Sequence, residues 1–293
     1  MKKPRADIIF DIVNFIILTI VFILVLYPLY FVIIASFSDP NYVNNGQIWL
    51  WPKGITFEGY QRVFEDPNII IGYKNSFIYA ILGTCINVIL TLLAAYSLSR
   101  KDFKGRSVFT FILAFTMFFG GGLIPTYLVV KKLSMLNTIW AMVIPNAVGV
   151  WNIIIARTFF QTNIPDELLE AAIIDGCSNT KFFFRIALPL SYALIAIMVL
   201  FYGVGHWNAF FNALIYLRDK KLFPLQLVLR GILIQNQMES EMIKDQDLLA
   251  HRQSLAEIIK YALIIVASLP VLILYPFLQK YFVKGIMIGA IKG

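Results

Sequence analysis

The feature that most constrains the fold is a series of long apolar runs separated by polar segments. The first run covers residues 8–37, and a helix needs only about 20 apolar residues to cross the hydrocarbon core of a bilayer. Five further runs follow, at residues 73–98, 108–130, 138–160, 188–217 and 255–278. Because lipid offers no hydrogen bonds to the backbone, such runs cross as helices. The runs predict an all-α integral membrane protein with six transmembrane helices, which form a single domain over residues 1–293.

Composition supports a membrane protein and argues against a soluble one. The chain is 59% hydrophobic and 14% charged, whereas soluble domains average about 45–50% apolar and about 25% charged residues. The net charge of +8 does not indicate nucleic-acid binding, because the basic residues stand at the ends of apolar runs and form no aromatic-rich patch.

The positions of the basic residues predict the orientation. Lys2, Lys3 and Arg5 precede the first run, as they would in a cleaved signal peptide. However, the run exceeds the usual 7–15 apolar residues of a signal peptide and lacks a small-residue cleavage site, which favours an uncleaved first helix. The basic cluster at residues 100–106 is predicted to be cytoplasmic, and both termini with it. The polar segments 38–72 and 218–254 are then external, with Trp49 and Trp51 at the membrane interface.

Two of the runs carry helix-breaking residues. Gly120, Gly121, Gly122 and Pro125 interrupt the third run, and Pro145 with Asn146 interrupts the fourth. Freed backbone groups at membrane depth are tolerated only beside protein or water. The third helix is therefore expected to face protein or a pore.

The polar segment 163–189 carries the signals of two short helices. Pro165 suits a first helical turn, and Asp166 and Glu167 suit the positive end of the helix dipole. An apolar stripe for packing is predicted from Leu168, Leu169, Ala172 and Ile173. Asp175-Gly176 should end this helix, Ser178 should cap a second one, and Pro189 should close the unit.

This segment resembles the EAA loop of ABC importer permeases. The family pattern is EAA, three residues, G, nine residues, I, one residue, LP, and it is matched at every fixed position from Glu170 to Pro189. The resemblance implies a type I ABC importer permease fold, with a cytoplasmic helix-turn-helix that docks on an ATPase subunit. Glu170, Ala171, Ala172, Asp175 and Gly176 would then form the ATPase-coupling site. The alternative is a generic amphipathic connector, since short EAA runs are common.

The last third of the chain resembles carbohydrate ABC importer permeases, with the branch for complex or uronate-containing oligosaccharides closest. The residues that carry this likeness are GVGHWNAFFNALIYL at 203–217, PLQ at 224–226 and QKYFVKG at 279–285. The resemblance implies a bacterial cell membrane, a homologous partner permease, ATPase subunits and an extracytoplasmic solute-binding protein that docks on loop 218–254. A permease for another small solute remains an alternative.

A substrate path is predicted in the fifth run. Polar and aromatic groups stand at membrane depth there, at His206, Trp207, Asn208, Phe211 and Asn212. Helical spacing would place positions 204, 208, 211, 212 and 215 on one face. Aromatic rings and amides suit a sugar, but the same residues could instead hold packed helices together.

No catalytic residues, metal ligands or cofactor-binding motif are predicted. The sequence lacks a GxxxxGK[ST] loop, an HExxH motif and a nucleophile elbow, so ATP would be hydrolysed on a partner. Cys85 and Cys177 show neither disulfide nor metal spacing. A membrane-embedded enzyme and a secondary transporter remain as alternatives, although neither explains the EAA segment.

Overall fold

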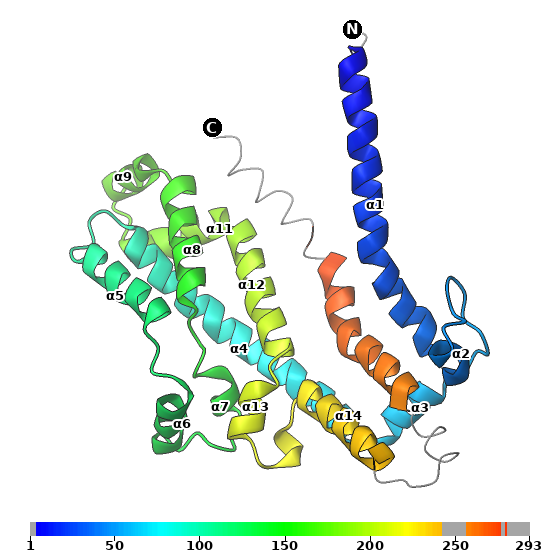
Figure 1. Cartoon of the computed structure of the whole chain (residues 1–293). Coiled ribbons are helices and arrows are strands. Elements are labelled where there is room, and N and C mark those ends of the chain that lie inside the picture. The colour runs from blue at the N-terminus through cyan, green and yellow to red at the C-terminus, as the bar shows by residue number, and fades with distance from the viewer. Residues whose placement is uncertain (1–3, 242–255, 277–278, 280–293) are drawn as a thin grey trace. The chain divides into compact units, whose positions relative to one another are not determined.

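The computed structural model describes residues 4–241, 256–276 and 279. Within these ranges, helices are the only regular secondary structure (Figure 1). The described residues divide into two compact units. The first contains residues 4–69, 229–241 and 256–269, and the second contains residues 70–228, 270–276 and 279.

The first unit is built on a long apolar helix, α1 (Arg5–Ser36). The most apolar window of this helix has no buried residue, as expected for a helix surrounded by lipid. Two short helices follow, α2 (Pro40–Asn44) and α3 (Glu58–Glu65). A small core joins the end of α1 to this segment and consists of Ile34, Ala35, Val43 and Ile48. Tyr261, in the last described helix Ala256–Pro276, packs against it.

The second unit holds most of the helices. They are α4 (Asn68–Ser99), α5 (Arg106–Phe118), α6 (Leu123–Lys132), α7 (Trp140–Val143), α8 (Val150–Asn163), α9 (Asp166–Ile174), α10 (Asn179–Phe182), a π-helical turn (Phe183–Ala187), α11 (Leu188–Leu190), α12 (Tyr192–Trp207), α13 (Phe211–Tyr216) and a 3-10 turn (Lys220–Leu222). The helix α14 (Leu225–Glu241) begins in the second unit and continues into the first. The largest core cluster takes residues from α4, α8 and α12, and Figure 1 shows these three helices together.

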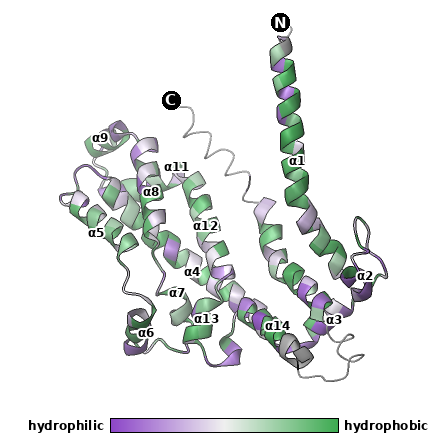
Figure 2. Ribbon diagram, viewed as in Figure 1, coloured by the Kyte–Doolittle hydropathy of each residue, from purple (hydrophilic) through white to green (hydrophobic). Residues whose placement is uncertain are grey.

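The number of membrane crossings depends on how bent helices are counted. Three described helices are long and apolar enough to cross, namely Ala6–Ser36, Asn68–Ser99 and Ala256–Pro276. Figure 2 colours each residue by its hydropathy and shows the many hydrophobic residues of these helices. Two bent pairs, α5 with α6 and the helix Asn179–Leu190 with α12, raise the number to five if each pair is one span. The predicted fourth run is split into α7 and α8, so the count of six remains a prediction.

The predicted interruption of the third run is confirmed. The chain turns by 115° between α5 and α6, and Gly122 takes a φ of +81°, which favours glycine. The run is therefore two short helices joined at the glycines.

The predicted continuous helix over residues 188–217 is wrong. The chain bends by 80° at Ser191, between Asn179–Leu190 and α12. It breaks again after Trp207, and α13 begins only at Phe211. Positions 204, 208, 211, 212 and 215 therefore do not share one helical face. The spacing argument assumed a single helix and had no signal for its end.

The predicted polar loop 218–254 is in large part helical. It contains the 3-10 turn Lys220–Leu222 and the whole of α14, and residues 242–254 lie outside the described part of the chain. Leu225, Val228 and Leu229 are buried and follow the i, i+3, i+4 spacing of a packed helix face. The charges of this stretch obscured that short apolar pattern.

Candidate functional site

The segment that matches the EAA pattern folds as a helix, a tight turn and a second helix. Asp166 and Glu167 occupy the first turn of α9, directly after Pro165. The N–H of Lys181 donates to Oγ of Ser178, which caps α10. Acidic residues at the positive end of α9 and a serine cap on α10 fix where each helix begins.

The turn between the two helices depends on Gly176. Its φ is +69°, in the left-handed region that side chains disfavour. The N–H of Gly176 donates to the carbonyl of Ile173 at 2.9 Å, and that of Cys177 to the carbonyl of Ala172 at 2.8 Å. These two bonds are the Schellman motif that ends a helix. A Cβ at Gly176 would have no neighbour within 4 Å, so the requirement for glycine comes from the backbone and not from space.

Only part of the predicted apolar stripe of α9 packs. Ala172 is buried in the core cluster and Leu169 lies against it, whereas Leu168 and Ile173 are largely exposed. Glu170, Ala171 and Asp175 are exposed as well.

Ile174, which the sequence did not single out, is 86% exposed at the end of α9. Leu168 and Ile173 of the same helix are 42% and 54% exposed, and exposed apolar side chains that gather outside the long apolar helices are typical of a protein contact. The structure therefore adds Ile174 to the candidate coupling surface.

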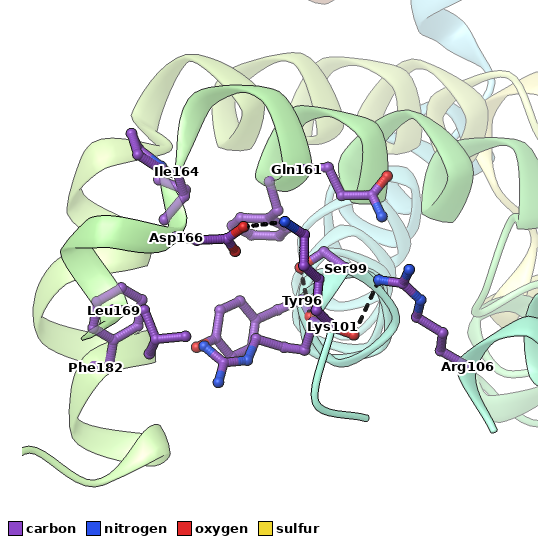
Figure 3. Close-up of a pocket in the computed structure, with 12 residues that line it drawn as sticks. Tyr96, Ser99, Lys101, Arg106, Gln161, Ile164, Asp166, Leu169 and Phe182 are labelled. Carbon is purple, nitrogen blue, oxygen red and sulfur yellow. Dashed lines mark hydrogen bonds and ion pairs between the residues drawn. The ribbon is translucent and has the colours of Figure 1, made fainter. Parts of the chain in front are cut away.

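A polar cavity of about 200 Å³ lies between α9 and the corner that joins α4 to α5 (Figure 3). Nζ of Lys101 pairs with Oδ2 of Asp166 at 2.5 Å across it. This hydrogen bond raises the pKa of Lys101. The sequence showed that residues 100–106 are basic, but not that one of them contacts α9.

The rest of the corner between α4 and α5 is held by an ion pair and a hydrogen bond among its own residues. The Arg100 guanidinium binds both carboxylate oxygens of Asp102, at 2.9 and 3.0 Å. This pairing lowers the pKa of the Asp102 carboxyl. Arg106 donates to the carbonyl of Arg100 at 3.4 Å. The corner between α4 and α5 is thus a structured partner for α9.

A row of buried polar side chains along α4, unnoticed in the sequence, holds other parts of the second unit. Nδ2 of Asn75 donates to the carbonyls of Lys221 and Phe223, at 2.8 and 3.0 Å. Farther along, Oγ1 of Thr91 lies 2.6 Å from the hydroxyl of Tyr202 in α12. These bonds satisfy polar groups that would be costly in lipid.

His206 and Trp207 are packed between helices. Nε2 of His206 lies 3.1 Å from the Asn87 amide. With the Asn87 oxygen turned toward His206, its Nδ2 donates to the carbonyls of Gly83 and Ala147, at 2.7 and 3.2 Å. The Trp207 ring is buried against Tyr73 and Phe77. Both side chains therefore have the helix-packing role that the sequence left open.

The other residues of the predicted path are more accessible. Asn208 is exposed beyond the end of α12, and its Nδ2 donates to the carbonyl of Val204 at 3.0 Å. Phe211 is 50% exposed and Asn212 is half-buried, both in the first turn of α13. The structure thus separates the five residues into a buried pair and an accessible group of three.

A second cavity, of about 570 Å³, is lined almost entirely by apolar groups from α4, α12 and residues 270–274. It offers few hydrogen bonds to a sugar, and Cys85 belongs to its lining.

In the described residues, no three His, Cys, Asp or Glu side chains gather in a way that could hold a metal ion.

These features define a multi-pass helical membrane protein with a structured polar corner at the ends of its helices. No protein-family model matches the chain. It is 40% identical to Protein LplC of Bacillus subtilis strain 168, over 100% of this chain and 98% of that protein. It is also 40% identical to the polygalacturonan/rhamnogalacturonan transport system permease protein YtcP of the same strain, over 91% of this chain and 92% of that protein.

A solved structure of a sugar transporter is similar to the chain as well. The chain matches a bacterial ABC transporter involved in the import of the acidic polysaccharide alginate, with a TM-score of 0.82 and 31% identity. The match covers 96% of this chain and 99% of that chain. The chain therefore belongs to the permease subunits of carbohydrate ABC importers, as its sequence motifs predicted.

Proposed function

We propose that the chain carries a uronate-containing oligosaccharide across a bacterial plasma membrane as one of two homologous permease subunits. Two relatives support an acidic sugar, since one is named for polygalacturonan and rhamnogalacturonan and the other imports alginate. ATP hydrolysis belongs to partner ATPase subunits, and a solute-binding protein delivers the sugar to the side that carries residues 218–254. Both termini are cytoplasmic, and residues 1–293 act as one permease domain.

Coupling to ATP hydrolysis is assigned to α9. The observation that carries this proposal is the shared core, in which Ala172 of α9 packs with Phe182, Phe183 and residues of α4, α8 and α12. Interiors are close-packed and transmit displacement with little compression. A movement of the ATPase against the exposed side of α9 would therefore reach the helices that cross the membrane.

Replacing Gly176 with leucine tests this role. The substitution forces a side chain into left-handed backbone geometry, at a cost of about 1–2 kcal/mol, and displaces the turn after α9. We expect sugar uptake and sugar-stimulated ATPase activity to fall by more than about tenfold in reconstituted transporters, in keeping with loss of a preorganised contact.

The matched control is Gly46→Leu. Gly46 has a φ of +65° and, like Gly176, no neighbour within 4 Å of a built Cβ. It carries the same backbone strain far from α9 in the sequence, so uptake should stay near the wild-type rate. Equal losses in the two variants would show that Gly176 serves stability alone.

The translocation path is assigned to Asn208, Phe211 and Asn212. Two amides and an exposed ring offer hydrogen bonds to hydroxyls and a stacking surface for a sugar ring. His206 and Trp207 support the path from behind its lining, because they fix the end of α12 against α4.

Cysteine accessibility tests this assignment in a background without Cys85 and Cys177. Asn208→Cys and Asn212→Cys should react with a water-soluble thiol reagent, and the sugar should slow the reaction. Ala213→Cys is the control, because Ala213 is fully buried next to Asn212. If the first two variants stay unlabelled in resting and nucleotide-trapped transporters, the partner permease holds the sugar.

A further inference from the structure

Residues 47–56 of the first unit, here called the tryptophan loop, present a row of uncovered apolar side chains. Trp49, Leu50 and Trp51 are 72%, 60% and 77% exposed. Three adjacent large apolar groups at these exposures indicate an interaction surface.

The tryptophan loop has a defined conformation. Ile48 is buried in the small core with Ile34 and Val43, directly beside the exposed Trp49. The backbone is tied on both sides of the tryptophans. The N–H of Gln47 donates to the carbonyl of Tyr42 at 2.9 Å, and the N–H of Asp39 donates to the carbonyl of Lys53 at 3.0 Å. The exposure of the two tryptophans is therefore a property of a fixed loop.

A hydrogen bond sets the position of the loop along α1. The hydroxyl of Tyr30 donates to the carbonyl of Leu50 at 2.5 Å. Tyr30 lies six residues before Ser36, the end of α1, which is about 9 Å at 1.5 Å per residue. The loop thus folds back along α1 toward the part of the helix that lies in lipid.

The depth of Tyr30 in the bilayer follows from the sequence of α1. Asp11 is the last charged residue of the helix, and about 20 residues cross the hydrocarbon core. Counting from Ile12 places the far edge of the core near Phe31, next to Tyr30. The loop therefore meets α1 where hydrocarbon gives way to lipid headgroups.

We propose that the tryptophan loop is an interfacial membrane anchor, in which Trp49, Leu50 and Trp51 insert into the edge of the bilayer beside α1. Tryptophan is favoured at this depth because its ring is apolar and its N–H can still bond to water or headgroups. The occupant of the surface is phospholipid, because the hydrogen bond to Tyr30 holds the loop at bilayer depth. The anchor would fix the depth of α1.

Fluorescence quenching in the assembled transporter tests the anchor. Leu50→Cys, in a background without Cys85 and Cys177, is labelled with an environment-sensitive fluorophore and reconstituted into phosphatidylcholine vesicles. Shallow spin-labelled lipids should quench this label at least about twofold more than a label on Asn45→Cys, as expected for an interfacial site. Asn45 is the control because it is exposed and polar at the end of α2.

Two further variants separate insertion from folding. Trp49→Ser with Trp51→Ser, or Tyr30→Phe alone, should reduce the lipid quenching of the label, whereas Trp49→Tyr with Trp51→Tyr should retain it. The unfolding temperature should change little in the tryptophan variants, because both side chains are exposed. Equal lipid quenching at Leu50→Cys and Asn45→Cys would overturn the proposal. Shielding of the Leu50→Cys label by the solute-binding protein or by an oligosaccharide would overturn it too, and would identify a docking surface for that partner.

Discussion

At the scale of single residues, the contact between Gly83 and His206 decides how closely α4 approaches α12. A Cβ built at Gly83 would lie 2.4 Å from Nε2 of His206, which is far inside van der Waals contact. Glycine to alanine normally stabilises a helix interior by about 1 kcal/mol. Here we expect Gly83→Ala to destabilise the protein by about 1–3 kcal/mol through overpacking, measured as a lower unfolding temperature in detergent.

Gly203→Ala is the matched control for this prediction. Gly203 is also a helical glycine at the α4–α12 contact, but its Cβ would meet Oγ1 of Thr84 at an ordinary 3.7 Å. This variant should be neutral or slightly stabilising. Removing the ring with His206→Ala should make room for alanine at Gly83, so the cost of Gly83→Ala should shrink in that background. If Gly83→Ala and Gly203→Ala have the same unfolding temperature, the contact between Gly83 and His206 is less close than the structure shows.

The sequence identified His206 and Asn208 as polar groups at membrane depth. It could not show whether each side chain packs between helices or lines the substrate path. His206 is satisfied by Asn87, in a helix far away in the sequence, and no local pattern reveals such a pairing. Asn208 falls just beyond the end of α12. The choice between the two roles depends on tertiary contacts that helical spacing does not encode.

At the scale of elements, α14 is the main departure from the sequence prediction. Leu225 at its start is fully buried, and its N–H donates to Oγ of Ser76 in α4 at 2.9 Å. A Cβ at Gly72 would lie 3.0 Å from the Leu225 Cα, so the start of α14 is packed closely against α4. This element cannot behave as a solvated loop.

Leu225→Ala tests the packing of α14. The change leaves a cavity in a closely packed contact, and we expect it to destabilise the protein by about 2–5 kcal/mol, seen as a lower unfolding temperature. Gln226→Ala is the control, since Gln226 is only partly buried in the same turn. A loop without a packed structure would show the same small change for both variants.

At the scale of the whole molecule, the sequence predicted the membrane class and the family but not the course of each crossing. Composition and the EAA pattern depend only on residue types and their spacing, so both can be recognised from the sequence alone. The bend of 115° lies at the glycines of residues 120–122 and the bend of 80° at the buried Ser191, and hydropathy averages over both. The family assignment is therefore more secure from sequence than the number of spans.

The central claim is that this chain is the membrane-crossing part of an ATP-driven importer, with α9 as its contact to the ATPase. The most direct measurement is co-purification of the tagged chain from its native membrane, with its partners identified by mass spectrometry. The account predicts stoichiometric recovery of an ATPase subunit and a second permease, and loss of the ATPase but not of the second permease in Gly176→Leu. A chain that purifies without any ATPase, and takes up sugar under an ion gradient without ATP, would contradict the account.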